Sequence, residues 1–205
     1  MSTRERATDL LRDLLGKDPP ERFSPDELGR KAHWRWDRGH YLEAAVLFEA
    51  AALRAAEEAR RAPHRDNTFN YRVRSGVTYR LAGENERAWP ILVEATTFDW
   101  QAAGIPEDSH FTEWAFVEML CVLAEAQDKR GFSEVFWRAV ARGEEIGLPF
   151  PRIHPKQELL LDVCEQLGLS RELARVVASI EARGKVPRRL ARRIAQLKAD
   201  MGGGS

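Results

Sequence analysis

Apolar residues along this chain recur three and four positions apart, the spacing that places side chains on one face of an α-helix. The segment from 41 to 61 shows this most clearly, because charged residues occupy the positions between the apolar ones. Little of the chain is left for strands. The pattern therefore predicts an all-α fold. Helices are expected over residues 3–15, 41–61, 158–167, 171–183 and 188–199.

Polar and helix-breaking residues predict where individual helices begin. Ser24 and Glu27 form a capping box around Pro25, which suits the first position of a helix. Pro90 falls beyond the first turn of its helix, where a missing N–H matters, and predicts a kink or a late start. Further helix starts are expected at Asp108 or Ser109, after a connection over residues 104–110, and at Ser133.

One spaced motif recurs along the chain, and its spacing has a reason in packing. Glycine lets the chain reverse between two helices, while alanines on the second helix let neighbours approach and one large apolar residue fills the space between them. Copies of such a motif are typical of stacked helical hairpins. The motif reads Gly39-x-Tyr41-x-x-Ala44-x-x-x-Phe48-x-x-Ala51, returns as Gly83-x-Asn85-x-x-Ala88-x-x-x-Leu92-x-x-Ala95, and starts again in weaker form at Gly131.

The first copy resembles the second half of the tetratricopeptide repeat, and Gly76 and Tyr79 match the first half ahead of the second copy. The resemblance implies a tetratricopeptide-like array of antiparallel helical hairpins, an α-solenoid, with capping helices at both ends. The motif glycines are 44 and 48 residues apart, against a family period of about 34, which implies longer helices or inserted loops. A non-repeating all-α bundle is the alternative. The expected hairpins cover about 25–62, 68–103 and 109–147, and closing helices cover 155–200.

The chain has 205 residues, of which 43% are hydrophobic and 31% are charged. This length can bury a core without dividing into two domains. We therefore expect one domain over residues 1–200. Residues 201–205, Met-Gly-Gly-Gly-Ser, resemble a flexible linker and are expected to lie outside the fold.

In tetratricopeptide arrays the first helix of each hairpin lines a concave groove, so the resemblance implies a partner-binding surface on these helices. Registered on Gly39, Gly83 and Gly131, this surface leans acidic around one tryptophan, which favours a basic protein as partner. The alternative is an ordinary solvated helix face with the tryptophan in the core. The implied binding residues are Asp26, His33, Trp36, Asp37, Asn70, Arg80, Glu118, Glu125 and Asp128.

The net charge is zero, from 32 basic and 32 acidic residues, but the two signs are unevenly distributed. Residues 183–198 hold seven basic residues and no acidic one, and Leu190, Ile194 and Leu197 share one face of the expected helix. The arginines could bind nucleic acid phosphates, an acidic protein, a second copy, or the acidic body of the same molecule. This basic patch consists of Arg188, Arg189, Arg192 and Arg193.

The sequence lacks the ingredients of common catalytic and metal sites. It holds no phosphate-binding, dinucleotide-binding, zinc-protease or serine-hydrolase motif, and its five histidines are scattered. The stretch His64-Arg65-Asp66-Asn67 is only superficially similar to a kinase catalytic loop, because the other kinase motifs are missing. Cys121 and Cys164 are 43 residues apart and predict neither a zinc site nor a disulfide. We expect no enzyme activity, no cofactor and no metal.

The sequence also lacks a signal peptide pattern and any run of about 18 apolar residues, which favours a cytoplasmic protein without membrane insertion. A helical array without catalytic motifs is expected to act by presenting a surface. We expect a non-catalytic adaptor or regulator that binds a partner protein. A specific form is an immunity or antitoxin protein whose acidic groove covers the active site of a basic toxin. A nucleic-acid-binding regulator that uses the basic patch is the alternative, and an unfamiliar enzyme is the third possibility.

Overall fold

The computed structural model describes residues 3–61, 67–98, 109–152, 154–182, 184 and 186–202. Within these residues the chain forms ten α-helices and one short 3-10 helix, and it contains no strand, which confirms the predicted all-α class. The chain divides into two compact units, residues 1–118 and residues 119–205. Each unit is described below by itself, and the expected single domain stays a prediction.

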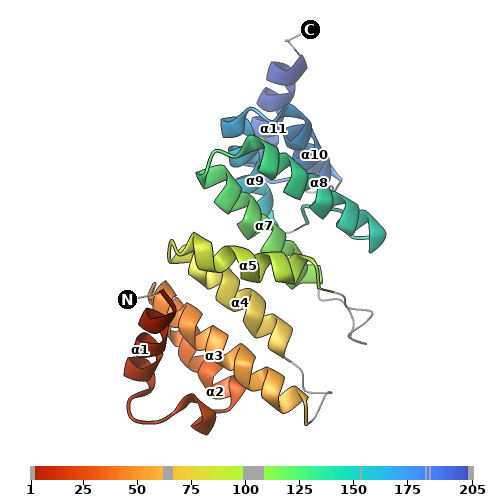
Figure 1. Cartoon of the computed structure of the whole chain (residues 1–205). Coiled ribbons are helices and arrows are strands. Elements are labelled where there is room, and N and C mark those ends of the chain that lie inside the picture. Colours follow the sequence, from red (N-terminus) through yellow and green to blue (C-terminus); the bar gives the residue numbers. More distant parts are fainter. Residues whose placement is uncertain are drawn as a thin grey trace. The chain divides into compact units, whose positions relative to one another are not determined.

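The first unit is built from helices that pack mainly on their neighbours along the chain. α2 packs on α3, α3 on α4 and α4 on α5, and α1 covers part of α3 (Figure 1). Leu28, Phe48 and Tyr79 are fully enclosed between these helices. The elements are α1 (Thr3–Leu15), η1 (Pro20–Arg22), α2 (Pro25–Trp36), α3 (Tyr41–Ala59), α4 (Thr68–Leu81), α5 (Asn85–Thr96) and the first part of α7 (Ser109–Glu125).

Local capping chemistry fixes the start of α2, as the sequence predicts. The Glu27 N–H donates to Ser24 Oγ at 3.3 Å, and Glu27 Oε2 accepts from the Ser24 N–H at 2.8 Å. These two bonds satisfy backbone donors that the helix itself leaves open. Pro25 occupies the first helical position, where its missing N–H has no cost.

The second unit holds the end of α7 and four further helices, and α9 packs against α10. Phe136 is fully buried, in edge contact with Phe150 from the connection between α8 and α9. The predicted apolar face of the last helix is confirmed, because Leu190, Ile194 and Leu197 are all buried. The helices are α8 (Lys129–Glu145), α9 (His154–Leu167), α10 (Ser170–Glu181) and α11 (Arg188–Gly202).

The same turn joins the helices of four successive pairs, α2/α3, α4/α5, α7/α8 and α9/α10. Gly39, Gly83, Gln127 and Gly168 have φ angles of 76°, 78°, 55° and 69° at these turns. Each of them donates its N–H to the carbonyl three residues earlier, and the next residue donates to the carbonyl five residues earlier. This pair of bonds is the Schellman ending of an α-helix, which requires a left-handed residue. The second helix of every pair begins two residues after that residue.

Residues at equal distances from these turns play the same packing role in all four pairs. The residue five positions after the left-handed residue is buried in each pair, as are those nine and twelve positions after it. The sequence predicted the first two sets, while the third and fourth are new. The sets are Ala44, Phe48 and Ala51; Ala88, Leu92 and Ala95; Phe132, Phe136 and Ala139; and Leu173, Val177 and Ile180.

The third turn lies one helical turn earlier than the sequence predicts. Gly131 is inside α8, where its N–H donates to Asp128 Oδ1 at 2.9 Å, and the turn residue is Gln127. Ser133 is therefore not a helix start, which corrects that prediction. The left-handed residues of the first three turns are evenly spaced, 44 residues apart, and Gly168 follows Gln127 after 41 residues.

Further helix boundaries confirm some of the sequence-based expectations and correct others. Pro90 lies inside α5, which begins at Asn85, so the helix does not start late, and the alternative of a kink stays a prediction. α7 begins at Ser109, one of the two expected starts, and His110 is helical rather than part of the connection, while Asp108 and the rest of the expected connection lie outside the described residues. α11 continues to Gly202 and so extends into the predicted tail.

Candidate partner-binding face

The turns place the predicted binding residues in register along the first helices of the pairs. Asp26 and Asn70 each lie thirteen residues before the left-handed residue of their turn. Because the third turn is at Gln127 rather than Gly131, the equivalent residue of α7 is Trp114 and not Glu118. By the same count Glu125 corresponds to Asp37.

Asp128 falls outside the set of equivalent positions altogether. It is the N-cap of α8, and its Oδ1 accepts the Gly131 N–H at 2.9 Å. Glu125 and Asp128 are both exposed and belong to the second unit, whereas the other predicted binding residues belong to the first.

Within the first unit, direct contacts connect α2 with α4. The Tyr71 hydroxyl of α4 donates to Asp26 Oδ1 at 2.8 Å. Burial, followed by this bond to the Asp26 carboxylate, raises the pKa of Tyr71 to about 12, so the hydroxyl keeps its proton. A Cβ at Gly29 would lie 2.7 Å from the Tyr71 ring, so glycine allows the two helices to approach this closely.

Contacts of the same kind connect α7 with α2 and α4. The rings of Trp36 and Trp114 meet edge to face with centroids 6.0 Å apart. Arg80 Nε lies 3.6 Å from Glu118 Oε2, and Trp114 Nε1 donates to Glu118 Oε1 at 3.0 Å. The predicted binding residues of the first unit and Trp114 are grouped here as one set, and that they share one face stays a prediction. We call this set the inner face: Asp26, His33, Trp36, Asp37, Asn70, Arg80, Trp114 and Glu118.

Trp36 is part of the packing of this face rather than a free anchor. Its ring also meets Tyr41 at 5.8 Å and Phe48 at 6.4 Å between centroids, both edge to face. The side chain is half-buried and packs against the hydrophobic core of the first unit. These contacts favour the alternative in which Trp36 supports the face from the core.

The charges on the inner face are of mixed sign. Glu118 is only 6% exposed and lies beside Arg80, whereas Asp26 and Asp37 are exposed. Arg74, which the sequence did not single out, lies with its guanidinium 5.2 Å from the centroid of Phe111. Burial, and then the charge of Arg74, lower the pKa of His33, while Asp37 opposes them. At neutral pH this histidine therefore stays uncharged.

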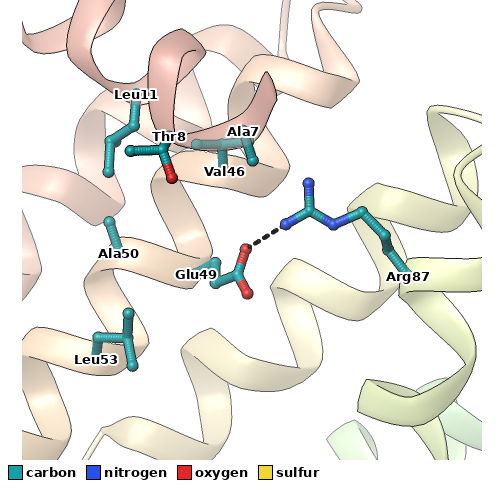
Figure 2. A pocket seen from close by; sticks show the side chains of 8 residues that line it. All are labelled: Ala7, Thr8, Leu11, Val46, Glu49, Ala50, Leu53 and Arg87. Carbon is teal, nitrogen blue, oxygen red and sulfur yellow. Dashed lines mark hydrogen bonds and ion pairs between the residues drawn. The ribbon is translucent and has the colours of Figure 1, made fainter. Parts of the chain in front are cut away.

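A separate pocket of about 230 Å³ lies between α1, α3 and α5 (Figure 2). Leu11 and Leu53 form part of its apolar lining, and Leu53 is 61% exposed. Its charged groups neutralise each other, because Arg87 Nη2 donates to Glu49 Oε2 at 3.0 Å. The buried Tyr79 hydroxyl donates to the same oxygen at 2.6 Å. Because these charged groups already bind each other, the pocket is poorly suited to a charged ligand.

The predicted basic patch on α11 divides into two parts. Arg193 reaches back to α9, with Nη1 2.5 Å from Asp162 Oδ1 and Nη2 2.8 Å from Glu165 Oε2. The bond to Glu165, opposed by burial and supported by Asp162, raises the pKa of this guanidinium further. Arg193 thus binds the acidic body of its own molecule. Arg188, Arg189 and Arg192 are exposed and form no ion pair with any residue that the structure describes.

The part of the chain that the structure describes shows neither a metal-binding cluster nor a membrane-spanning helix. No group of three or more histidine, cysteine, aspartate or glutamate side chains there is arranged to hold a metal ion. None of the helices described above combines the length and the apolar composition that a bilayer crossing requires.

Comparison of the chain with protein-family models, with curated proteins and with solved structures finds no match. The likeness to tetratricopeptide repeats therefore remains a resemblance in motif, and the chain is assigned as an all-α protein of sequentially packed helices.

Proposed function

We propose that this chain is a non-catalytic protein-interaction module, an adaptor or regulator that binds a partner protein along the inner face. The observation that supports the proposal is the equivalence of the turns, which gives the first helices of successive pairs equivalent residue positions. In a tetratricopeptide-like array those first helices line the binding surface. On the inner face, exposed carboxylates stand beside half-buried aromatic rings, a combination suited to a polar protein surface.

The partner in this proposal is basic. Asp26 in the first turn of α2 and Asp37 at its C-cap lie eleven positions apart, three turns along the same helix face, and both carboxylates are exposed. Exposed carboxylates on a binding face raise the association rate of a cationic partner. One specific form is an immunity or antitoxin protein that covers the basic active site of a toxin acting on nucleic acid. The activity then belongs to the partner.

A charge change on α2 tests the proposal. Asp26→Asn keeps an acceptor for the Tyr71 hydroxyl, and Asp37→Lys places a cation at the carboxyl end of α2, where the helix dipole favours it. The chain is first used to isolate its partner from a lysate of its source organism. The double variant is expected to bind that partner at least about tenfold more weakly in calorimetry.

The matched control carries the same change in charge away from the inner face. Asp13→Lys with Glu86→Gln also raises the net charge by three, at exposed positions of α1 and α5. The control variant is expected to bind the partner like the unchanged chain. Equal binding by both variants and the unchanged chain would remove the inner face from the proposal.

Nucleic acid binding through α11 is the second candidate, supported by the exposed Arg188, Arg189 and Arg192. Replacing these three residues by alanine should then weaken binding to a DNA duplex and reduce the salt dependence by about 2.7 in log–log slope. A control with Lys17, Arg60 and Arg61 replaced by alanine removes three exposed cations from the first unit. If DNA binding weakens to the same extent in both triple variants, the attraction between the chain and DNA is unspecific and this candidate fails.

A further inference from the structure

A stripe of cations surrounds an exposed tryptophan on α2. Its members lie one and four positions apart, so they share one side of the helix. Trp34 is 49% exposed, whereas most of the large apolar side chains that the structure describes are buried or half-buried. We call the stripe the α2 patch, and it consists of Arg30, Lys31, Trp34, Arg35 and Arg38.

Aromatic rings hold three of these cations in place. The guanidinium of Arg38 lies 3.8 Å from the centroid of the Trp34 ring, and that of Arg35 lies 4.8 Å from it. Arg38 also donates to the Trp34 carbonyl at 3.2 Å. Lys31 Nζ lies 5.3 Å from the centroid of Phe23. Cations that are already ordered in this way lose less conformational entropy when they bind an anion.

A pocket of about 410 Å³ opens beside the stripe, between α1, α2 and α3. Leu14 from α1, Leu47 from α3 and the Trp34 ring give it apolar walls, while Arg30, Lys31 and Arg35 give it charged ones. Its volume suits one large apolar side chain together with neighbouring polar groups. The pocket thus combines an apolar interior with cationic edges.

The positive charge of the α2 patch is only partly neutralised within the molecule. Arg35 pairs with Glu43 at 2.8 Å, and it is the one cation of the patch with an ion pair among the described residues. Glu27 lies near Arg30 and Lys31, but its carboxylate closes the capping box with Ser24. The bonds from Ser24, more than the nearby cations, lower the pKa of Glu27, so it stays ionised. The four cations of the patch thus lie near two carboxylates, Glu43 and Glu27, of which the first already pairs with Arg35 and the second already accepts from Ser24.

We propose that the α2 patch docks an acidic segment of a partner protein, with one large apolar side chain of that segment seated between Leu14, Trp34 and Leu47. Carboxylates on either side of the seated residue pair with Arg30, Lys31 and Arg38. A protein segment fits better than nucleic acid for two reasons. The Arg38 guanidinium already lies on the Trp34 ring where a base would stack, and the pocket walls match an aliphatic or aromatic side chain. The α2 patch and the inner face share no residue and call for partners of opposite charge, so this inference does not rest on the proposed function, although Arg30 is near enough to Tyr71 to lower the pKa of that hydroxyl.

Peptide binding tests the inference directly. The probe is a dye-labelled peptide, Glu-Asp-Phe-Leu-Asp-Glu, titrated with the full chain and followed by fluorescence anisotropy. We expect saturable binding that drops at least about tenfold when serine replaces both apolar residues of the peptide, because one buried apolar side chain contributes that much. A peptide with lysine at the acidic positions should not bind.

Variants of the chain locate the binding. Arg30→Glu with Lys31→Glu is expected to weaken peptide binding at least about tenfold, and Trp34→Ala should do the same, while Trp34→Phe keeps most of the affinity. Arg188→Glu with Arg189→Glu makes the same change in charge on α11 and should leave binding unchanged. All variants are checked for helical circular dichroism. Absence of saturable binding, equal loss in both charge variants, or tighter binding of a short oligothymidylate at the same residues would overturn the inference.

Discussion

Gln127 holds a backbone shape that glycine provides at the equivalent turns. Its φ angle is 55°, in the left-handed region where a side chain normally costs about 1 kcal/mol or more. Its Nε2 donates to the Ala124 carbonyl at 3.1 Å, which ties the side chain to the end of α7 and offsets part of that cost. The strain is local, and a single substitution can relieve it.

Gln127→Gly is expected to raise the free energy of unfolding of the second unit by about 0.5 kcal/mol, because relief of the left-handed strain exceeds the added freedom of the unfolded chain. Urea unfolding followed by circular dichroism measures the change. The reverse substitution, Gly168→Gln, should lower stability by about 1 kcal/mol. A loss of stability in Gln127→Gly would show that the glutamine contributes more than its backbone costs.

His33 carries a pH dependence of predictable sign. Burial and Arg74 lower its pKa below the ordinary 6.5, so the folded protein binds fewer protons at this site than the unfolded chain does. Its contribution to stability is present above pH 6.5 and is lost as the pH falls toward the folded-state pKa. In an NMR titration its midpoint should lie below 6.5 and should rise in Arg74→Gln. The exposed Arg60→Gln serves as control, and an equal shift there would exclude a specific effect of Arg74.

Among the elements, the sequence predicted those whose signals are local. The capping box starts α2 where expected, and apolar spacing predicts α1 over Thr3–Leu15 and the start of α3 at Tyr41. The start of α8 was missed because the sequence shows which residue is glycine but not which residue has a positive φ. Gln127 provides the turn, and Gly131 was mistaken for it.

That one displaced turn also limited the prediction of the binding face. The contacts of Asp26, Trp36 and Arg80 join the first helices of the first unit. Trp114 was not proposed, because registering on Gly131 put Glu118 in its place. The fourth helix pair was expected only as closing helices, since its buried positions are filled by larger residues than the alanines of the motif.

The attachment of α11 depends on Arg193 and on the apolar residues beside it. Arg193→Ala should lower the stability of this helix by about 0.5–1 kcal/mol, as expected for partly exposed ion pairs, and Ile194→Ala by about 2–4 kcal/mol. Amide hydrogen exchange within α11 measures both effects. Arg192→Ala removes an exposed arginine without an ion pair among the described residues and should leave exchange unchanged. Equal effects of Arg192 and Arg193 would contradict the assigned pairing.

At the scale of the whole molecule, packing between neighbours along the chain limits how far a local defect can spread. Each helix of the first unit from α2 to α5 packs mainly on the helices before and after it. Proteins whose elements contact mainly their neighbours along the chain can unfold one part at a time, because their stability is approximately the sum of contributions from adjacent elements. The two compact units are the natural parts in this chain.

Two matched core substitutions test this division. Leu28 in α2 and Leu160 in α9 are both fully buried, so replacement of either by alanine should cost about 2–5 kcal/mol. Hydrogen exchange is expected to accelerate in α2–α5 for Leu28→Ala and in α8–α11 for Leu160→Ala. Acceleration of the whole chain by either variant would mean that the two units unfold as one.

Because both cysteines lie in the second unit, their chemical reactivity can report how often that unit opens. Cys121 and Cys164 are the two cysteines of the chain, both are buried, and both belong to residues 119–205. Burial, with a smaller effect of Glu172, raises the pKa of Cys164 to about 12, so little reactive thiolate exists until the unit opens. In the reaction with an aromatic disulfide reagent, the protein thiolate forms a mixed disulfide and releases one aromatic thiolate, so the rate of that release reports how often the second unit opens, without any label on the first.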